Sequence, residues 1–237
     1  MTLHLQFPSL TIEKNKRRSA VIAVYPDDKV VVRVPHRMPI KAIEDWIRSK
    51  ADWIQKRLHH NAQWRQKNPP KAYISGEMLL YLGKEMCLNL KQEKKTRVYL
   101  EGDFIHVCHA QFEEAGDHKD MVIKLLSKWY KAQAQDILQD RIEIYAPQIG
   151  RPYADVRYKK LKTRWGSCSS KGNLNFNWAL VMAPLDIIDY VVVHELCHLV
   201  HHHHKPSFWN LVGKYYPRYE EAKKWLRIHG GQMRIES

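Results

Sequence analysis

The feature that most constrains this chain is an H-E-x-x-H motif, formed by His194, Glu195 and His198. Residues 187–200 around it are mostly apolar, which predicts a buried helix. At about 100° per residue, histidines four positions apart lie one turn apart on the same face, so both imidazoles can reach one ion. Two histidines and a glutamate would be costly in an apolar helix without a bound partner. The motif therefore predicts a metal site, and Zn²⁺ is the expected ion.

A tetrahedral site of this kind needs a third protein ligand, and four more histidines follow at positions 201–204. If the helix continued, His201 and His202 would lie about 10–12 Å along its axis from His194, too far to share one ion. The chain must therefore turn before it supplies the third ligand.

The position of that turn can be inferred from Pro206, which disfavours helical geometry at the residue before it. The helix should then end within the histidine run, with His202 or His203 in a left-handed conformation. We expect His204 to return to the site as the third ligand. His203 and His201 remain the alternatives.

The chemistry expected at such a site is hydrolysis. Glu195 leans toward the same opening as the two histidines, where it can take a proton from water activated by the metal. A developing oxyanion would need a further hydrogen-bond donor. Arg164, His201, Tyr190 and Tyr215 are all candidates, and the sequence does not choose among them.

Size and composition indicate a globular intracellular protein. The chain has 237 residues, of which 44% are hydrophobic, enough for one large domain or two small ones. No apolar stretch reaches the roughly 18 residues that a membrane-spanning helix needs, and the first residues do not resemble a signal peptide. The 4 cysteines are widely spaced and are expected to be reduced thiols in the cytoplasm. The oligomeric state stays open.

The chain is strongly basic, with a formal net charge of +14. Its basic residues cluster in three segments: Lys14–Arg18, Lys91–Arg97 and Arg157–Arg164. Such an excess favours a polyanionic partner or an acidic substrate, although a solvated strand face would have the same composition. We expect sequence-indifferent DNA binding at low salt, weakened by neutralising Lys159, Lys160 and Lys162.

The order of predicted elements indicates an α+β fold. The amino-terminal half reads as a hairpin at 19–34, a helix from Pro39 to before Asn68, and a meander of hairpins at 73–107. The second half reads as a long helix from Asp117 to about Gly150, a basic strand at 156–164, a turn at 165–172, a strand at 173–177, the motif helix from Pro184, and short helices at 207–216 and 219–228. We therefore expect a β-rich basic region at 1–115 and a core at 116–237, or one integrated unit.

Four segments carry a resemblance to a known family: Thr163-Arg164-Trp165-Gly166-Ser167-Cys168, Asn173-Leu174-Asn175-Phe176-Asn177, His194-Glu195-Leu196-Cys197-His198-Leu199 and His204-Lys205-Pro206-Ser207-Phe208-Trp209. Together they resemble the YgjP-like family, bacterial zinc metallopeptidases of the zincin type that are similar to SprT-like peptidases. The resemblance implies that His194, His198 and His204 bind zinc and that Glu195 is the catalytic base.

The resemblance also implies a zincin-like metallopeptidase core at 116–237, in which an edge strand near Trp165 or at 173–177 holds an extended peptide. The function expected on this basis is zinc-dependent hydrolysis of peptide or protein substrates, acting near DNA. The alternative is a nucleic-acid-binding protein whose zinc is structural and closed by a second histidine of the 201–204 run. Glu195 separates the two, because a structural site needs neither an open position nor a base.

Overall fold

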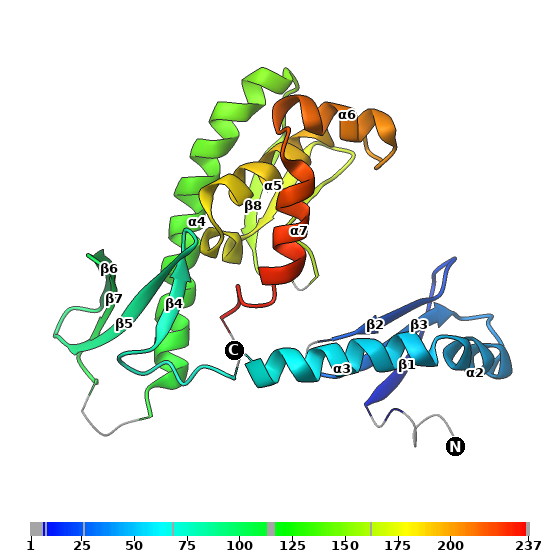
Figure 1. The fold of residues 1–237 in the computed structure, drawn as a ribbon, viewed down its shortest axis with the longest axis horizontal. Coiled ribbons are helices and arrows are strands. Elements are labelled where there is room, and N and C mark those ends of the chain that lie inside the picture. Colours follow the sequence, from blue (N-terminus) through cyan, green and yellow to red (C-terminus); the bar gives the residue numbers. More distant parts are fainter. Residues whose placement is uncertain are drawn as a thin grey trace. The chain divides into compact units, whose positions relative to one another are not determined.

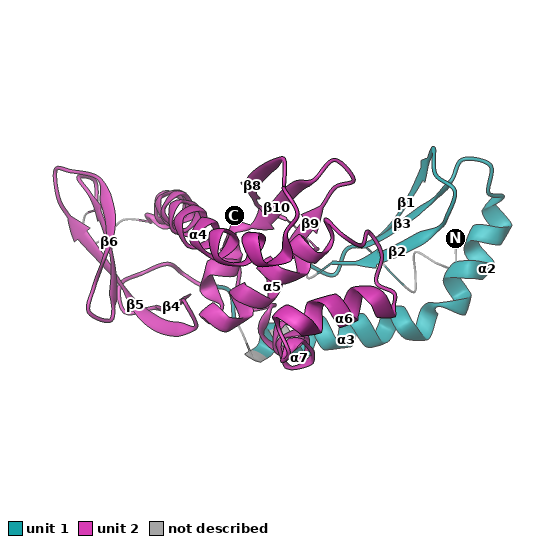
Figure 2. Ribbon diagram, turned by 90° about the horizontal axis from the view of Figure 1, so that it is seen from above, with its two compact units in different colours: residues 1–70 teal, residues 71–237 magenta. Residues whose placement is uncertain are grey.

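The computed structural model describes residues 7, 9–25, 27–67, 69–112, 117–161 and 163–235. The chain divides into two compact units, Met1–Pro70 and Lys71–Ser237, drawn in teal and magenta in Figure 2. Each unit combines helices with sheets of mixed strand direction, so the predicted α+β class is confirmed. The expected boundary between residues 115 and 116 falls inside the second unit. None of the described helices is both long and apolar enough to span a membrane.

The first unit is built on a three-stranded sheet of β1 (Leu10–Asn15), β2 (Val21–Val24) and β3 (Val30–Pro35), in the order β1-β3-β2. The predicted hairpin is confirmed as the antiparallel β2–β3 pair. The parallel pairing of β1 with β3 was not expected from the sequence. One continuous helix was also expected here, but the chain forms α2 (Ile40–Ser49) and α3 (Ala51–Lys67), with Lys50 between them.

The second unit begins with a four-stranded sheet of β4 (Met78–Tyr81), β5 (Lys84–Gln92), β6 (Arg97–Glu101) and β7 (Phe104–His109). The predicted meander is wrong, because the strand order is β4-β5-β7-β6 and β5 runs parallel to β7. Buried residues of this sheet, such as Leu88 and Val107, share one core with Leu126 and Tyr130 of the long helix α4 (Lys119–Ile149). This shared core explains why the sheet belongs to the second unit.

The second sheet of this unit consists of β8 (Asp155–Lys159), β9 (Gly166–Cys168) and β10 (Asn173–Asn177), in the order β8-β10-β9. Residues 165–172 were expected to form only a turn, but they contain β9, which is antiparallel to β10. Because β10 lies between two partners, it has no free edge for a substrate. Of the two segments considered for that role, only the one beside Trp165 forms an edge strand, β9.

Helix α5 (Leu185–Cys197) carries the motif and starts where predicted, with Pro184 as its N-cap. It follows the short 3₁₀ helix η1 (Trp178–Met182) and precedes α6 (Pro206–Tyr215) and α7 (Tyr219–His229). Figure 1 shows α5 alongside the upper part of α4, with β4–β7 near the lower part. A two-pronged ion pair joins the two helices, in which Arg141 Nη2 donates to Asp189 Oδ2 over 2.8 Å. Helix α5 is therefore held firmly within the core.

Candidate active site

The motif helix ends earlier than the sequence suggested. α5 stops at Cys197, with His198 as its C-cap, rather than within the histidine run. The chain then tightens, because Val200 N–H donates to the Cys197 carbonyl three residues back over 3.1 Å. The left-handed turn expected at His202 or His203 is also wrong, since the described non-glycine residues with positive φ are Asp28, Tyr73 and Leu82. The helix thus ends in a turn with hydrogen bonds to the residue three positions back. Residues 201–204 follow this turn with negative φ angles, so their backbone is not strained.

The turn brings three imidazoles together. One nitrogen from each of His194, His198 and His204 lies within 4.8 Å of the others. The Nε2 atoms of His194 and His204 are 3.2 Å apart, close to the roughly 3.3 Å expected for two nitrogens bound tetrahedrally at 2.0–2.1 Å from Zn²⁺. His201 and His203 do not join this group, and their rings pack on each other instead, with centroids 5.5 Å apart.

An aromatic clamp formed by Phe208 and Trp209 of α6 holds the imidazoles. Phe208 is fully buried and stacks on His198 with ring centroids 4.4 Å apart. Trp209 stacks on His204, and its indole N–H donates to the His204 carbonyl over 3.2 Å. Sequence reasoning did not assign these roles. The signal was present as two aromatic residues in the first turn of a helix that opens with Pro206.

Hydrogen bonds orient the histidine rings from behind. The Nδ1–H of His198 donates to the His201 carbonyl over 2.9 Å, because a carbonyl can only accept. This fixes the tautomer that leaves His198 Nε2 with a free lone pair, as in many histidine metal ligands. The hydroxyl of Tyr190 lies 3.5 Å from Nδ1 of His194. Both contacts leave the nitrogens that converge on the site available.

The electrostatics of the site keep two of these imidazoles, those of His194 and His198, neutral. Burial and, to a smaller extent, positive charge on His198, His204 and Lys223 lower the pKa of His194 to about 3. Burial also lowers the pKa of His198. Since only the neutral ring has a lone pair to offer a cation, the low pKa values favour the metal-binding form.

Glu195 follows His194 in α5 and its side chain is buried, with only 5% of the residue's surface exposed. Its Oε2 atom has no hydrogen-bond partner in the described part of the chain. Burial raises the pKa of this carboxyl to about 8, and the positive charge of Arg164 acts against that rise. A cation bound by the histidines would also favour the ionised form. Three converging imidazoles and an unpaired carboxylate oxygen therefore fit a divalent cation.

Gly166 allows β9 to lie directly against Glu195. A Cβ atom at this position would be 2.5 Å from Cγ of Glu195 and 2.6 Å from its Oε1. Only glycine avoids that overlap. From the sequence, Gly166 was expected only in a turn, because its contact with Glu195 depends on a close approach between segments far apart in the sequence.

This close approach predicts the effect of Gly166→Ala. The added methyl group would displace the Glu195 carboxyl, and we expect unfolding to become easier by about 1–3 kcal/mol. Displacing a catalytic group by about 1 Å can slow a reaction about 100-fold. The rate of peptide cleavage should therefore fall much more than the loss of folded protein alone would explain. Gly213→Ala is the control, because its Cβ would have no neighbour closer than 3.4 Å. Urea unfolding and a peptide-cleavage assay test both variants, and full activity in Gly166→Ala would contradict the expectation.

The structure narrows the four candidates for an oxyanion donor. Tyr215 donates its hydroxyl to the Gln148 carbonyl over 2.9 Å, and Tyr190 lies behind His194. Both hydroxyls are therefore engaged away from the opening. Arg164 and His201 remain as candidate oxyanion donors. Of these two, Arg164 has a positive charge that acts on the pKa of Glu195.

Two solved structures are similar to parts of this chain. One is the crystal structure of the metallopeptidase zymogen abylysin of Pyrococcus abyssi, at 26% identity over 42% of this chain and 99% of that chain, with a TM-score of 0.36. The other is the metallopeptidase zymogen jannalysin of Methanocaldococcus jannaschii, at 24% identity over 41% of this chain and 95% of that chain, with a TM-score of 0.33. No curated protein sequence matches the chain.

A family model gives the broader assignment. The model of the YgjP-like metallopeptidase domain matches residues 18–229, which include both H-E-x-x-H histidines, His204, Phe208 and Trp209. The match covers nearly the whole chain and agrees with the resemblance seen in the sequence motifs. This protein is a member of the YgjP-like metallopeptidase family.

Proposed function

We propose that this protein is a zinc-dependent peptidase in which His194, His198 and His204 hold the ion and Glu195 is the general base. The observation that carries the proposal is the convergence of three imidazoles in one cluster that includes the helix neighbour of a buried glutamate with an unpaired oxygen. Zn²⁺ in this position would act as a Lewis acid that polarises the scissile carbonyl and increases the acidity of water. Zinc is the ion that this donor set favours, because neutral imidazoles suit it well.

The residues around the ion would transfer the proton and hold the metal ligands in position. Glu195 would accept a proton from the attacking water through Oε2 and pass it to the leaving amine. His198 keeps its ring orientation through the His201 carbonyl, and Phe208 and Trp209 keep the imidazoles in place. Because these supports do not depend on a ligand, the site is organised before substrate binds.

The substrate is proposed to be a peptide or protein that pairs with β9 as an additional strand. β9 is an edge strand next to Glu195, and its free edge can offer backbone hydrogen bonds to an extended peptide. Such pairing would bring the peptide backbone to the opening where the imidazoles converge.

The alternative, a nucleic-acid-binding protein with a structural zinc, is less well supported. A structural zinc site takes four protein ligands. The converging group contains three histidines, and His204 is the one member that comes from the run at 201–204, whose four residues are all described. A structural zinc site would also give no role to Glu195. Its buried and unpaired oxygen would then lower the stability of the fold without serving a function.

Zinc dependence is the direct test of this proposal. Chelation of the purified full-length chain should abolish cleavage of a mixed peptide library, and stoichiometric Zn²⁺ should restore it. The readout is mass spectrometry of the digested peptides, and Mg²⁺ is the control because it prefers oxygen ligands. Cleavage that survives chelation, or that Mg²⁺ restores equally well, would contradict the proposal.

A further inference from the structure

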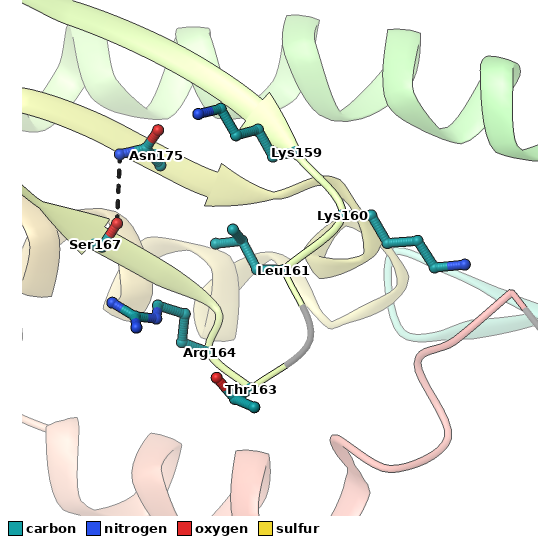
Figure 3. Close-up of a pocket in the computed structure, with 7 residues that line it drawn as sticks. All are labelled: Lys159, Lys160, Leu161, Thr163, Arg164, Ser167 and Asn175. Atoms are coloured by element: carbon teal, nitrogen blue, oxygen red, sulfur yellow. Dashed lines mark hydrogen bonds between the residues drawn. The ribbon is translucent and has the colours of Figure 1, made fainter. Parts of the chain in front are cut away.

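A second feature of this unit is a pocket on the sheet formed by β8, β10 and β9, with a volume of about 380 Å³. We call it the basic pocket. Figure 3 shows Lys159 and Asn175 on one side of it, with Ser167 and Arg164 on the other. Lys160 and Thr163 also line it. The basic segment singled out in the sequence thus forms part of a cavity, although Lys162 lies outside the described residues.

The charge of the basic pocket is not neutralised. Neither Lys159 nor Arg164 forms an ion pair with any acidic residue in the described part of the chain, and none of the described lining residues is acidic. Lys160 instead donates to the Ile235 carbonyl over 3.3 Å. Two exposed cations around a hollow attract anions, because they have no ion-pair partner in the described part of the chain, although the charge of Arg164 also acts on the buried Glu195 carboxyl.

Neutral donors complete the lining. The amide of Asn175 donates to Ser167 Oγ over 3.3 Å, as Figure 3 shows, and this leaves the hydroxyl proton of Ser167 available for a ligand. The buried amide of Asn177 donates to the Leu161 carbonyl over 2.9 Å and anchors the loop that carries Arg164. The pocket is therefore a built site with a fixed rim, and its donors suit a small anion.

The position of the pocket relative to Glu195 follows from the strand register. Ser167 pairs with Asn175, so both side chains project from one face of the sheet. Gly166 projects from the opposite face, because a Cβ there would meet Glu195. A peptide paired with the free edge of β9 would alternate in the same way. Its residue opposite Ser167 would point toward the pocket, and the residues on either side would point toward the face where Glu195 lies.

We propose that the basic pocket binds the carboxylate of an aspartate or glutamate in the peptide substrate, at the residue that pairs with Ser167. The proposal rests on the proposed function and names its substrate class as acidic peptide segments. Arg164 supplies charge from the loop before β9, and Ser167 supplies a hydrogen bond. Lys159 lies on β8, on the far side of β10, and acts through its electrostatic field. A carboxylate side chain is favoured over a nucleic acid because no described lining residue is aromatic, and single strands bind largely by base stacking.

Binding of designed peptides tests the pocket without relying on catalysis. The protein is the full-length, zinc-loaded chain with Glu195→Gln, so that the probes stay intact. The first probe is a fluorescein-labelled peptide of alternating threonine and glutamate, which as a strand places every glutamate on one face. The second replaces each glutamate by glutamine. The third, the paired peptide, has the same composition as the first, but two threonines alternate with two glutamates. As a strand it therefore places glutamates on both faces.

Fluorescence anisotropy at physiological salt gives the affinities. We expect the alternating glutamate peptide to bind about 5-fold more tightly than the glutamine peptide, the difference between charged and neutral hydrogen bonds, and more tightly than the paired peptide. Lys159→Gln should reduce the preference for glutamate about threefold or more. Lys128→Gln is the matched control, since Lys128 is exposed on α4 and does not line the pocket.

Several outcomes would overturn the proposal: equal affinity for the glutamate and glutamine peptides, equal affinity for the two glutamate peptides, or equal losses in Lys159→Gln and Lys128→Gln. A labelled oligothymidine that loses more affinity in Lys159→Gln than the peptide does would assign the pocket to phosphates instead. If the glutamate preference is present but the wild-type zinc-loaded protein cleaves no peptide, the proposed function fails and the pocket assignment stands.

Discussion

Glu195→Gln is expected to abolish peptide hydrolysis while leaving the bound metal in place. Removing a general base slows a reaction about 100-fold to 10,000-fold, and glutamine cannot accept the proton. The three imidazoles are unchanged, so zinc content should stay near that of the wild type. The measurements are the cleavage rate of a fluorogenic peptide and the zinc content per chain by inductively coupled plasma mass spectrometry.

The control for this variant is Glu85→Gln. Glu85 is exposed on β5 and takes no part in the histidine cluster, so the same change of charge there should leave both rate and metal content unaltered. Full peptidase activity in Glu195→Gln would remove the base from the proposed mechanism. Loss of zinc together with activity would instead give Glu195 a role in holding the ion.

The part of the site that could be predicted from the sequence depends on short-range geometry. The helical spacing of His194 and His198 and the constraint of Pro206 on the residue before it both operate within a few residues. They favoured His204 over the alternatives His203 and His201, and the structure brings His204 to the other two. The turn after α5 was less well predicted. It is formed by hydrogen bonds to the residue three positions back, and neither His202 nor His203 adopts the expected left-handed conformation.

The parts that could not be predicted depend on contacts between distant segments. β9 has three residues, too few to show the alternation by which a strand is recognised. Its pairing with β10 and the approach of Gly166 to Glu195 appear only in three dimensions. The same applies to β5 and β7, whose parallel pairing leaves β6 at the edge of the sheet and cannot be inferred from two adjacent hairpin signals. Local periodicity gives the elements, and long-range packing decides their partners.

The proposed ligand assignment implies that the run of histidines does not act as a redundant cluster. His201 contributes its carbonyl, which accepts from His198 and would be retained in alanine. The ring of His203 accepts a hydrogen bond from the Lys205 N–H over 3.3 Å, a contact local to the loop. His202 is exposed. Of these four residues, His204 is the one whose ring contacts Trp209 and both other imidazoles.

Single alanine substitutions at positions 201–204 should therefore differ sharply in zinc affinity. We expect His204→Ala to weaken zinc binding more than 100-fold, because loss of an outer-shell partner alone costs about 10-fold to 100-fold. His201→Ala, His202→Ala and His203→Ala should stay within about 10-fold of the wild type. His194→Ala is the positive control. Competition with a zinc-sensitive dye measures the affinities, and the zinc-dependent rise in Tm checks them independently, since ligand binding stabilises the folded state. Equal losses in all four variants would mean that the run binds zinc collectively and that the choice of His204 is wrong.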